Sequence, residues 1–296
     1  SAAVKAMQNP TAVGLDTRYE YLPEGYAPLG ENWLEDAARG VLRFNKELID
    51  GLCGIIPAVK VQIAYYEMYG LPGMQCFYET VKYAKERGMV VIADAKRGDI
   101  GATAQAYAHA FLSGPEIAGR RCDAFPADIL TVNPYFGTDG LQPFLDACAG
   151  TGKGLFILVK TSNPTSGEFQ DQEYDGKTLY ERVGDQVAAW AAPLMGESGY
   201  SSIGAVVGAT YPAQGAALRK RLPGIYFLVP GYGAQGAKGA DLAGCFDGKG
   251  GGAIINASRS IICAHRKQPG VHFVEAARNE ALRMREDIMS AVGSIR

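Results

Sequence analysis

The segment with the clearest chemical potential is Asp94-Ala-Lys96-Arg-Gly-Asp99, which directly follows the apolar run Val-Val-Ile-Ala. Residues two apart on a strand face the same side, so we expect Asp94 and Lys96 to point together. We expect Asp99 just beyond the strand, in a loop or first helical turn. Lys60 ends an earlier apolar run. Two lysines and two aspartates around one pocket would hold each other charged and fixed before a substrate arrives. The alternative is a salt-bridge network without a chemical role.

A second pattern indicates an anion site. Val229-Pro230-Gly-Tyr-Gly-Ala-Gln235-Gly follows one apolar run, and Asn-Ala-Ser258-Arg259 ends the next. Glycines allow the backbone to approach a ligand closely, and arginine offers a two-pronged hydrogen-bond donor. In barrel enzymes, loops after the last two strands often bind phosphate. For the glycine-rich loop alone, a mobile surface loop is the alternative.

A third pattern is Lys160-Thr-Ser162-Asn163-Pro164, again after an apolar run. Serine and asparagine offer donors and acceptors that suit the edge of a flat, amide-like ring. A simple turn before the proline explains the same residues equally well.

The elements that position these residues are eight short apolar runs with amphipathic stretches between them. Strands that are apolar on both faces are typical of buried parallel sheets. Eight such units predict an α/β fold, a (β/α)₈ TIM barrel, as a single domain over residues 1–296. An open doubly wound sheet is the alternative, but no G-x-G-x-x-G follows the first run. The predicted strands are 11–17, 56–62, 90–96, 129–135, 154–162, 203–210, 225–231 and 253–259.

Polar residues end nearly all these runs, among them Asp16, Asn133 and Lys160. In a barrel of this kind the active site lies at that face. The predicted helices include 33–52, 77–87, 141–149, 178–194 and 273–292.

The amino-acid composition indicates which binding partners and which cellular compartment to expect. The 29 basic and 31 acidic residues give a formal net charge of −2, so neither nucleic acid nor an acidic membrane is an expected partner. The six cysteines lack metal-ligand or disulfide-framework spacing, which fits a reducing cytoplasm. We expect no metal, no signal peptide and no membrane span.

Taken in order, the motifs resemble the orotidine 5′-phosphate decarboxylase family. Asp94-x-Lys96-x-x-Asp99-Ile100-x-x-Thr103 is similar to its signature, and Lys-Thr-Ser162-Asn-Pro looks like its longer bacterial branch. The resemblance covers all eight predicted strands. The segment 114–126 has no obvious counterpart in short family members, which affects only the expected dimer rim.

The resemblance assigns roles residue by residue. It implies a charged catalytic set in which Lys96 donates a proton, and it implies that Asp99 and Thr103 reach into a neighbouring subunit's site. Asp16 matches a ribose ligand, Ser162 a pyrimidine ligand, and Gln235 and Arg259 phosphate ligands. The catalytic set is Lys60, Asp94, Lys96 and Asp99; the substrate-binding set is Asp16, Ile100, Thr103, Ser162, Pro230, Gln235, Ser258 and Arg259.

The function implied is decarboxylation of orotidine 5′-phosphate to UMP and CO2 in pyrimidine biosynthesis. A homodimer with shared sites, and no metal or cofactor, is expected.

Two alternatives stay open. Metal-dependent sugar-phosphate enzymes share the Asp-x-Lys-x-x-Asp motif. In those enzymes the end of the second strand looks like a carboxylate ligand for the metal, whereas this chain has Lys60 at that position. A non-catalytic nucleotide-binding barrel would not need the buried charges, which are costly without a task.

Overall fold

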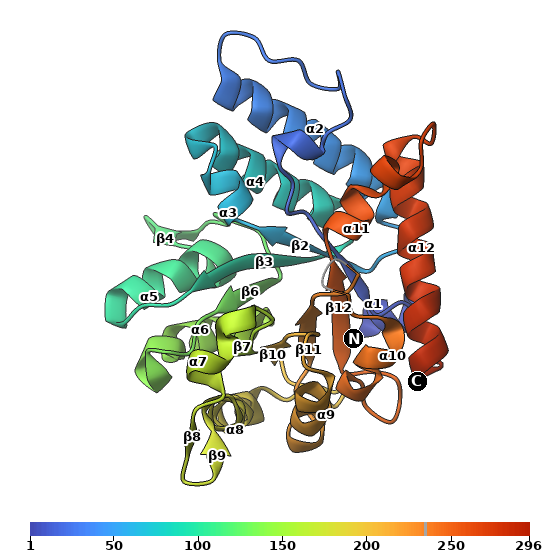
Figure 1. The fold of residues 1–296 in the computed structure, drawn as a ribbon. Helices are drawn as coiled ribbons and strands as arrows, with labels where there is room; N and C mark the ends of the chain where they lie inside the picture. The colour runs from blue at the N-terminus through green and yellow to red at the C-terminus, as the bar shows by residue number, and fades with distance from the viewer. Residues whose placement is uncertain (234–235) are drawn as a thin grey trace.

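The computed structural model describes residues 1–233 and 236–296. Its centre is a closed barrel in which every neighbouring pair of strands is parallel, as Figure 1 shows. The predicted barrel is therefore confirmed. Seven of its eight strands lie within predicted runs, and β3 extends one residue beyond its run, to Arg97. The barrel strands are β1 (Thr11–Gly14), β2 (Ala58–Gln62), β3 (Val90–Arg97), β6 (Ile129–Val132), β7 (Gly154–Lys160), β10 (Ile203–Val207), β11 (Phe227–Pro230) and β12 (Ala253–Ala257).

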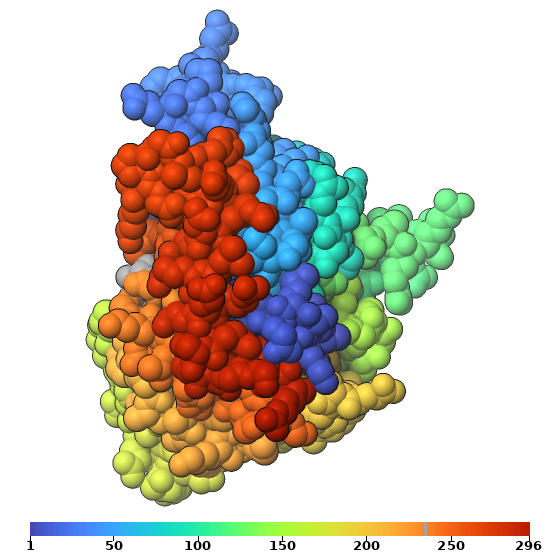
Figure 2. All heavy atoms as spheres, turned by 90° about the vertical axis from the view of Figure 1, so that its right-hand side faces the viewer, coloured from blue at the N-terminus to red at the C-terminus, as the bar shows by residue number. Residues whose placement is uncertain are grey.

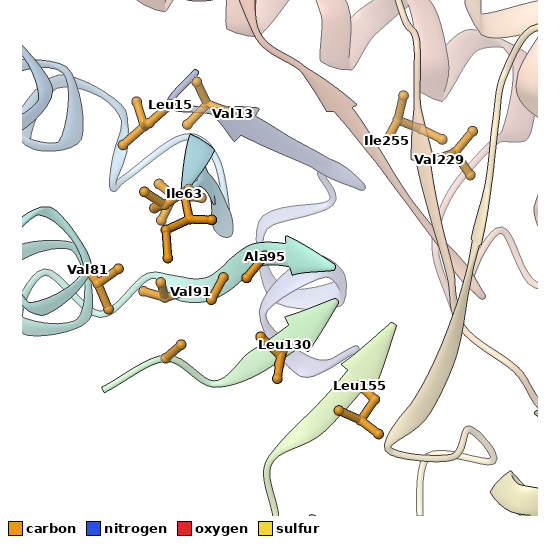
Figure 3. Packing of buried hydrophobic residues seen from close by; sticks show 14 of the residues in the cluster. Val13, Leu15, Ile63, Val81, Val91, Ala95, Leu130, Leu155, Val229 and Ile255 are labelled. Carbon is orange, nitrogen blue, oxygen red and sulfur yellow. The ribbon is translucent and has the colours of Figure 1, made fainter. Parts of the chain in front are cut away.

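Both faces of these strands are buried, which is why they read as continuous apolar runs. One face points into the barrel, where Ile92, Phe156 and Leu228 belong to one apolar cluster. The opposite face packs under the surrounding helices, and Figure 3 shows Val13 and Val91 in this second layer. The two layers hold the strand ends in a fixed ring, so side chains beyond the apolar positions meet at one mouth.

Helices surround the barrel, and two predicted helices match the structure from end to end: α2 (Trp33–Leu52) and α12 (Phe273–Val292). The others near predicted ranges are α4 (Gly70–Glu86), α6 (Gly137–Thr151) and α8 (Leu179–Ala191). Further helices are α1 (Ala2–Met7), α3 (Ala64–Glu67), α5 (Gly101–Ala108), α7 (Gly167–Gln170), α9 (Pro212–Arg221), α10 (Gly239–Leu242) and α11 (Arg259–Ile262), with a π-helical turn at His109–Ser113.

The start of α4 differs from the prediction, which placed it at Phe77. Its first turn, Gly-Leu-Pro-Gly, has the composition of a loop. Gly73 is required there because a Cβ would lie 1.8 Å from the carbonyl oxygen of Tyr66. The helix therefore begins at Gly70 by packing closely on α3, a tertiary contact that local composition does not reveal.

Two small hairpins decorate the barrel. The segment 114–126 contains β4 (Glu116–Ile117) and β5 (Arg120–Arg121), which pair antiparallel and project from the body in green in Figure 2. A second hairpin joins β8 (Glu173–Tyr174) and β9 (Lys177–Thr178). Figure 2 also shows α1 beside the C-terminal segment, where Gln8 exchanges hydrogen bonds with Ile295. None of the helices described is both long and apolar enough to cross a membrane.

Candidate active site

The carboxyl ends of the strands surround a cavity of about 650 Å³. Eight of the predicted site residues line it, and they come from strands on all sides of the barrel. This cavity is large enough for a nucleotide-sized ligand. The predicted residues in its wall are Asp16, Lys60, Asp94, Lys96, Ser162, Pro230, Ser258 and Arg259.

A chain of ion pairs crosses the cavity floor. Lys60, only 4% exposed, places its Nζ 3.1 Å from Asp16 Oδ1 and 3.0 Å from Asp94 Oδ2. Lys96 Nζ lies 2.6 Å from Asp94 Oδ1. Asp94 therefore bridges two ammonium groups, and the second carboxylate of the cluster is Asp16 rather than Asp99.

The electrostatic environment keeps these groups charged. Burial would raise the pKa of Asp94, but Lys60 and Lys96 outweigh burial and hold that pKa well below its usual value. Burial would likewise lower the pKa of Lys60, but Asp16 and Asp94 outweigh it and raise that pKa. Asp94 and Lys60 therefore stay charged across the neutral pH range.

Lys96 reaches the cavity through an irregular strand end rather than by simple alternation. Its φ is +47°, a left-handed backbone conformation, and the pairing of β3 with β6 changes register between Ala93 and Arg97. The Lys96 backbone N–H donates to Thr131 Oγ1 at 2.9 Å, and that hydroxyl donates to Asp94 Oδ1 at 3.0 Å. Thr131 therefore orients both members of the pair. Strain of this kind persists where surrounding contacts enforce it, often at functional sites.

The side of the cavity opposite Lys96 is formed by the end of β11 and by the segments after β11 and β12. Pro230, Gly231 and Tyr232 line it beside Arg259. Ser258 Oγ donates to Asp16 Oδ2 at 2.7 Å, which joins this side to the charged floor. The predicted phosphate ligand Gln235 lies outside the described residues.

Gly14 makes room for this junction, because a Cβ there would lie 2.0 Å from Ser258 Oγ. A side chain at this position would displace the serine from Asp16.

Ser162 lies in the wall after β7, and its backbone is tightly held. A Cβ on Gly208 would lie 2.8 Å from Ser162 N, so only glycine fits against it. Gln170 clamps the neighbouring Thr161 by accepting from its backbone N–H at 2.9 Å and donating to its hydroxyl at 2.7 Å. Gly208 and Gln170, which do not line the cavity, therefore hold this part of the wall in place.

Three predicted site residues lie away from this chain's own cavity. Asp99 and Ile100 lie just before α5, and Thr103 lies on its exposed surface. Asp99 Oδ1 accepts a hydrogen bond from the Ile100 backbone N–H at 2.8 Å, and Ile100 is 55% exposed. None of the three belongs to the cavity wall.

Two residues that end predicted strands are not part of the wall. Lys160 is fully buried, with its Nζ 2.6 Å from Asp171 Oδ1 and 4.9 Å from the ring centroid of Tyr211. Asn133 Oδ1 accepts from the Tyr135 backbone N–H and so closes a turn. The polar side chains at these two strand ends therefore lie outside the active-site cavity.

The sequence reasoning also missed polar residues in the wall. Gln62 Nε2 donates to Asp94 Oδ2 at 3.1 Å, and Thr131 orders Asp94 and Lys96. Gln62 stands two residues after Lys60 on β2, so counting in steps of two from Lys60 could have found it. Thr131 lies on β6, at a position that no polar neighbour in the sequence marked. The missed polar lining residues include Arg18, Gln62, Tyr65, Thr131 and Asn256.

A closed (β/α)₈ barrel with paired lysines and aspartates at its mouth defines an enzyme with its active site at the carboxyl ends of the strands. Residues 14–271 match the model of the orotidine 5′-phosphate decarboxylase / HUMPS family. The chain belongs to this family. The predicted family and enzyme class, a carboxy-lyase, are confirmed.

The relatives agree along most of the chain. It is 42% identical over 271 residues to an orotidine 5′-phosphate decarboxylase of Rhodopirellula baltica, covering 90% of this chain and 88% of the relative. It is 41% identical over 283 residues to one of Clostridium tetani, covering 95% and 93%.

Among solved structures, the chain is similar to a putative orotidine 5′-phosphate decarboxylase of Streptomyces avermitilis, at 34% identity and a TM-score of 0.79. That match covers 98% of this chain and 95% of the other.

Proposed function

We propose that the protein converts orotidine 5′-phosphate to UMP and CO2 without a metal or cofactor, and that Lys96 protonates C6 of the pyrimidine. The observation that carries this proposal is the chain of ion pairs from Asp16 through Lys60 and Asp94 to Lys96. It supports a site built to stabilise negative charge at one fixed point. The family relationship supports the choice of substrate.

The reaction breaks the bond between C6 and the carboxyl carbon. CO2 leaves, and the electron pair stays at C6 in the ring plane, where resonance offers little help. The ammonium of Lys96 stabilises this pair and then transfers a proton to C6. Its 2.6 Å contact with Asp94 holds it in place before the reaction.

The remote phosphate contributes through binding energy. Arg259 lines the opposite side of the cavity from Lys96, and the substrate-binding role covers Asp16, Ser162, Pro230, Ser258 and Arg259. Contacts far from C6 help to fix the ring against the charged floor. A substrate without phosphate should lose kcat as well as affinity.

Lys60 separates this proposal from the metal-dependent alternative. A buried ammonium held by two carboxylates occupies the position where a metal ligand would be needed, and it would repel Mg²⁺. The test is the absorbance change of orotidine 5′-phosphate on turnover in EDTA. Full activity in EDTA supports the proposal, whereas activity that returns only with added Mg²⁺ contradicts it.

We further propose a homodimer in which Asp99, Ile100 and Thr103 complete the partner's site. Their place at the start of α5 supports that role, because Ile100 and Thr103 are exposed, Asp99 is partly exposed, and none of the three lines this chain's own cavity. A two-fold interface makes the contribution reciprocal.

Subunit mixing tests the shared site. Lys96→Ala and Asp99→Ala homodimers should each be nearly inactive. After exchange, half of the dimers are mixed, and one of their two sites carries neither defect. Activity should therefore return to roughly a quarter of the wild-type value, from symmetry alone. If the mixture stays inactive although exchange is verified independently, Asp99 acts within its own chain.

A further inference from the structure

One carboxylate on the C-terminal helix contacts the segment between β11 and α10 at both of its stems. Asp287 Oδ2 on α12 accepts a hydrogen bond from Tyr232 Oη at 2.7 Å. The same oxygen accepts from the Gly239 backbone N–H at 2.8 Å. Tyr232, two residues after β11, belongs to the first stem, and Gly239, the first residue of α10, belongs to the second, so a single side chain ties the two stems together.

The packing around this carboxylate is close. Tyr232 is only 3% exposed, and a Cβ on Gly239 would lie 2.4 Å from the Asp287 carbonyl oxygen. Burial and the Asp287 carboxylate raise the pKa of Tyr232 to about 12, so the phenol keeps its proton and donates at neutral pH. The segment therefore rests directly on α12.

The first stem connects this anchor to the cavity. Tyr232 lines the cavity together with Pro230 and Gly231, whereas Asp287 does not. A Cβ on Gly233 would lie 3.4 Å from Ser260 Oγ, which places this stem against the neighbour of Arg259. A carboxylate inside the cavity would repel a phosphate, but here it lies behind Tyr232 and acts only on the position of the wall.

We propose that Asp287 is a positioning residue for phosphate recognition: it fixes both stems of the β11–α10 segment and so keeps the wall at residues 230–232 in place beside Arg259. This inference rests on the proposed function, because it assigns the phosphate of the ligand to that side of the cavity. The ribose and ring contacts of Asp16 and Ser162 lie elsewhere in the wall and should not depend on Asp287.

The test compares binding of UMP and of uridine, which lacks only the phosphate, by NMR titration. In Asp287→Ala the affinity for UMP should fall about tenfold or more, because two hydrogen bonds are lost, one to a buried donor. The affinity for uridine should stay within twofold of the wild-type value. Tyr232→Phe removes one of the two bonds and should give the same selective loss, but smaller.

Glu286→Gln is the matched control, because it removes one negative charge from the neighbouring, exposed position of the same helix. It should change neither affinity. Should Asp287→Ala fold poorly, Tyr232→Phe, which deletes a single hydroxyl, carries the same test.

Equal losses for UMP and uridine would mean that Asp287 merely stabilises the fold, and no loss for UMP would mean that it positions nothing. Either result overturns the inference. Decarboxylation by the wild-type protein checks the proposed function separately, so the two failures are distinguishable.

Discussion

Two buried lysines lie on barrel strands, Lys60 on β2 and Lys160 at the end of β7, and their surroundings differ. Lys60 faces the cavity and has two carboxylates as partners. Lys160 faces away from the cavity, forms an ion pair with Asp171 and lies near the rings of Tyr180 and Tyr211. Lys60 therefore belongs to the candidate active site, whereas Lys160 belongs to the structure that supports the barrel.

The difference arises from strand geometry. Lys60 stands at an inward position of a regular strand, whereas the pairing of β7 with β10 changes register between Val206 and Val207, next to Lys160. An irregularity of this kind redirects the side chains that follow it. Whether a lysine near the end of a strand faces the active site therefore depends on the register between that strand and its neighbours.

The largest expected effect comes from Asp94→Asn, which removes the central carboxylate of the open cluster. Both Lys60 and Lys96 lose a partner, and Lys60 is buried. Breaking a buried pair costs about 3–5 kcal/mol of unfolding free energy. We expect that loss in urea denaturation, together with a fall in kcat of about a thousandfold or more, since Lys96, the proposed proton donor, is no longer held. A variant with near wild-type kcat would show that the cluster is structural.

Asp171→Asn is the matching change in the closed pair and should act mainly on stability. Asp171 is partly exposed, with 39% of its side chain accessible, so water can partly replace it at Lys160. We expect a loss of about 2 kcal/mol of unfolding free energy and kcat within about tenfold of wild type. If kcat falls as far as in Asp94→Asn, the distinction between the two pairs is wrong.

The smallest expected effect is on the free energy of unfolding as pH changes around neutrality. The pKa of Asp94 is lowered on folding, so its contribution is fully present above about pH 4 and is lost as pH falls further. The pKa of Lys60 is raised, so its contribution is fully present below about pH 10 and is lost as pH rises. Between these limits both contributions should be flat. Urea denaturation from pH 3 to 9 measures this, and a slope near pH 7 that disappears in Asp94→Asn would contradict it.

Much of the fold could be predicted because the strands are apolar on both faces and the long helices carry clear periodicity. Helix α2 matched from Trp33 to Leu52 for that reason. Helix α9 has no comparable apolar face, with basic residues through its last turn, and periodicity did not reveal it.

The site was only partly predictable. Lys60, Asp94 and Lys96 follow apolar runs and were found, although Lys96 reaches the cavity through a positive φ that alternation does not describe. Arg18 lies beyond the end of β1, just before a short 3₁₀ turn, where no regular pattern indicates a direction. The direction of the Lys160 side chain could not be predicted from the sequence, because it depends on the pairing of two strands distant in sequence.

The most direct test of the central claim compares Lys96→Ala with Arg259→Ala in turnover and in UMP binding. Lys96→Ala should lose nearly all kcat and still bind UMP within a few-fold of wild type, because the proposed phosphate-binding side of the cavity is intact. Arg259→Ala should mainly raise KM, with a smaller effect on kcat. Equal losses of UMP binding in both variants, or substantial kcat in Lys96→Ala, would contradict the assignment of chemistry to the charged floor.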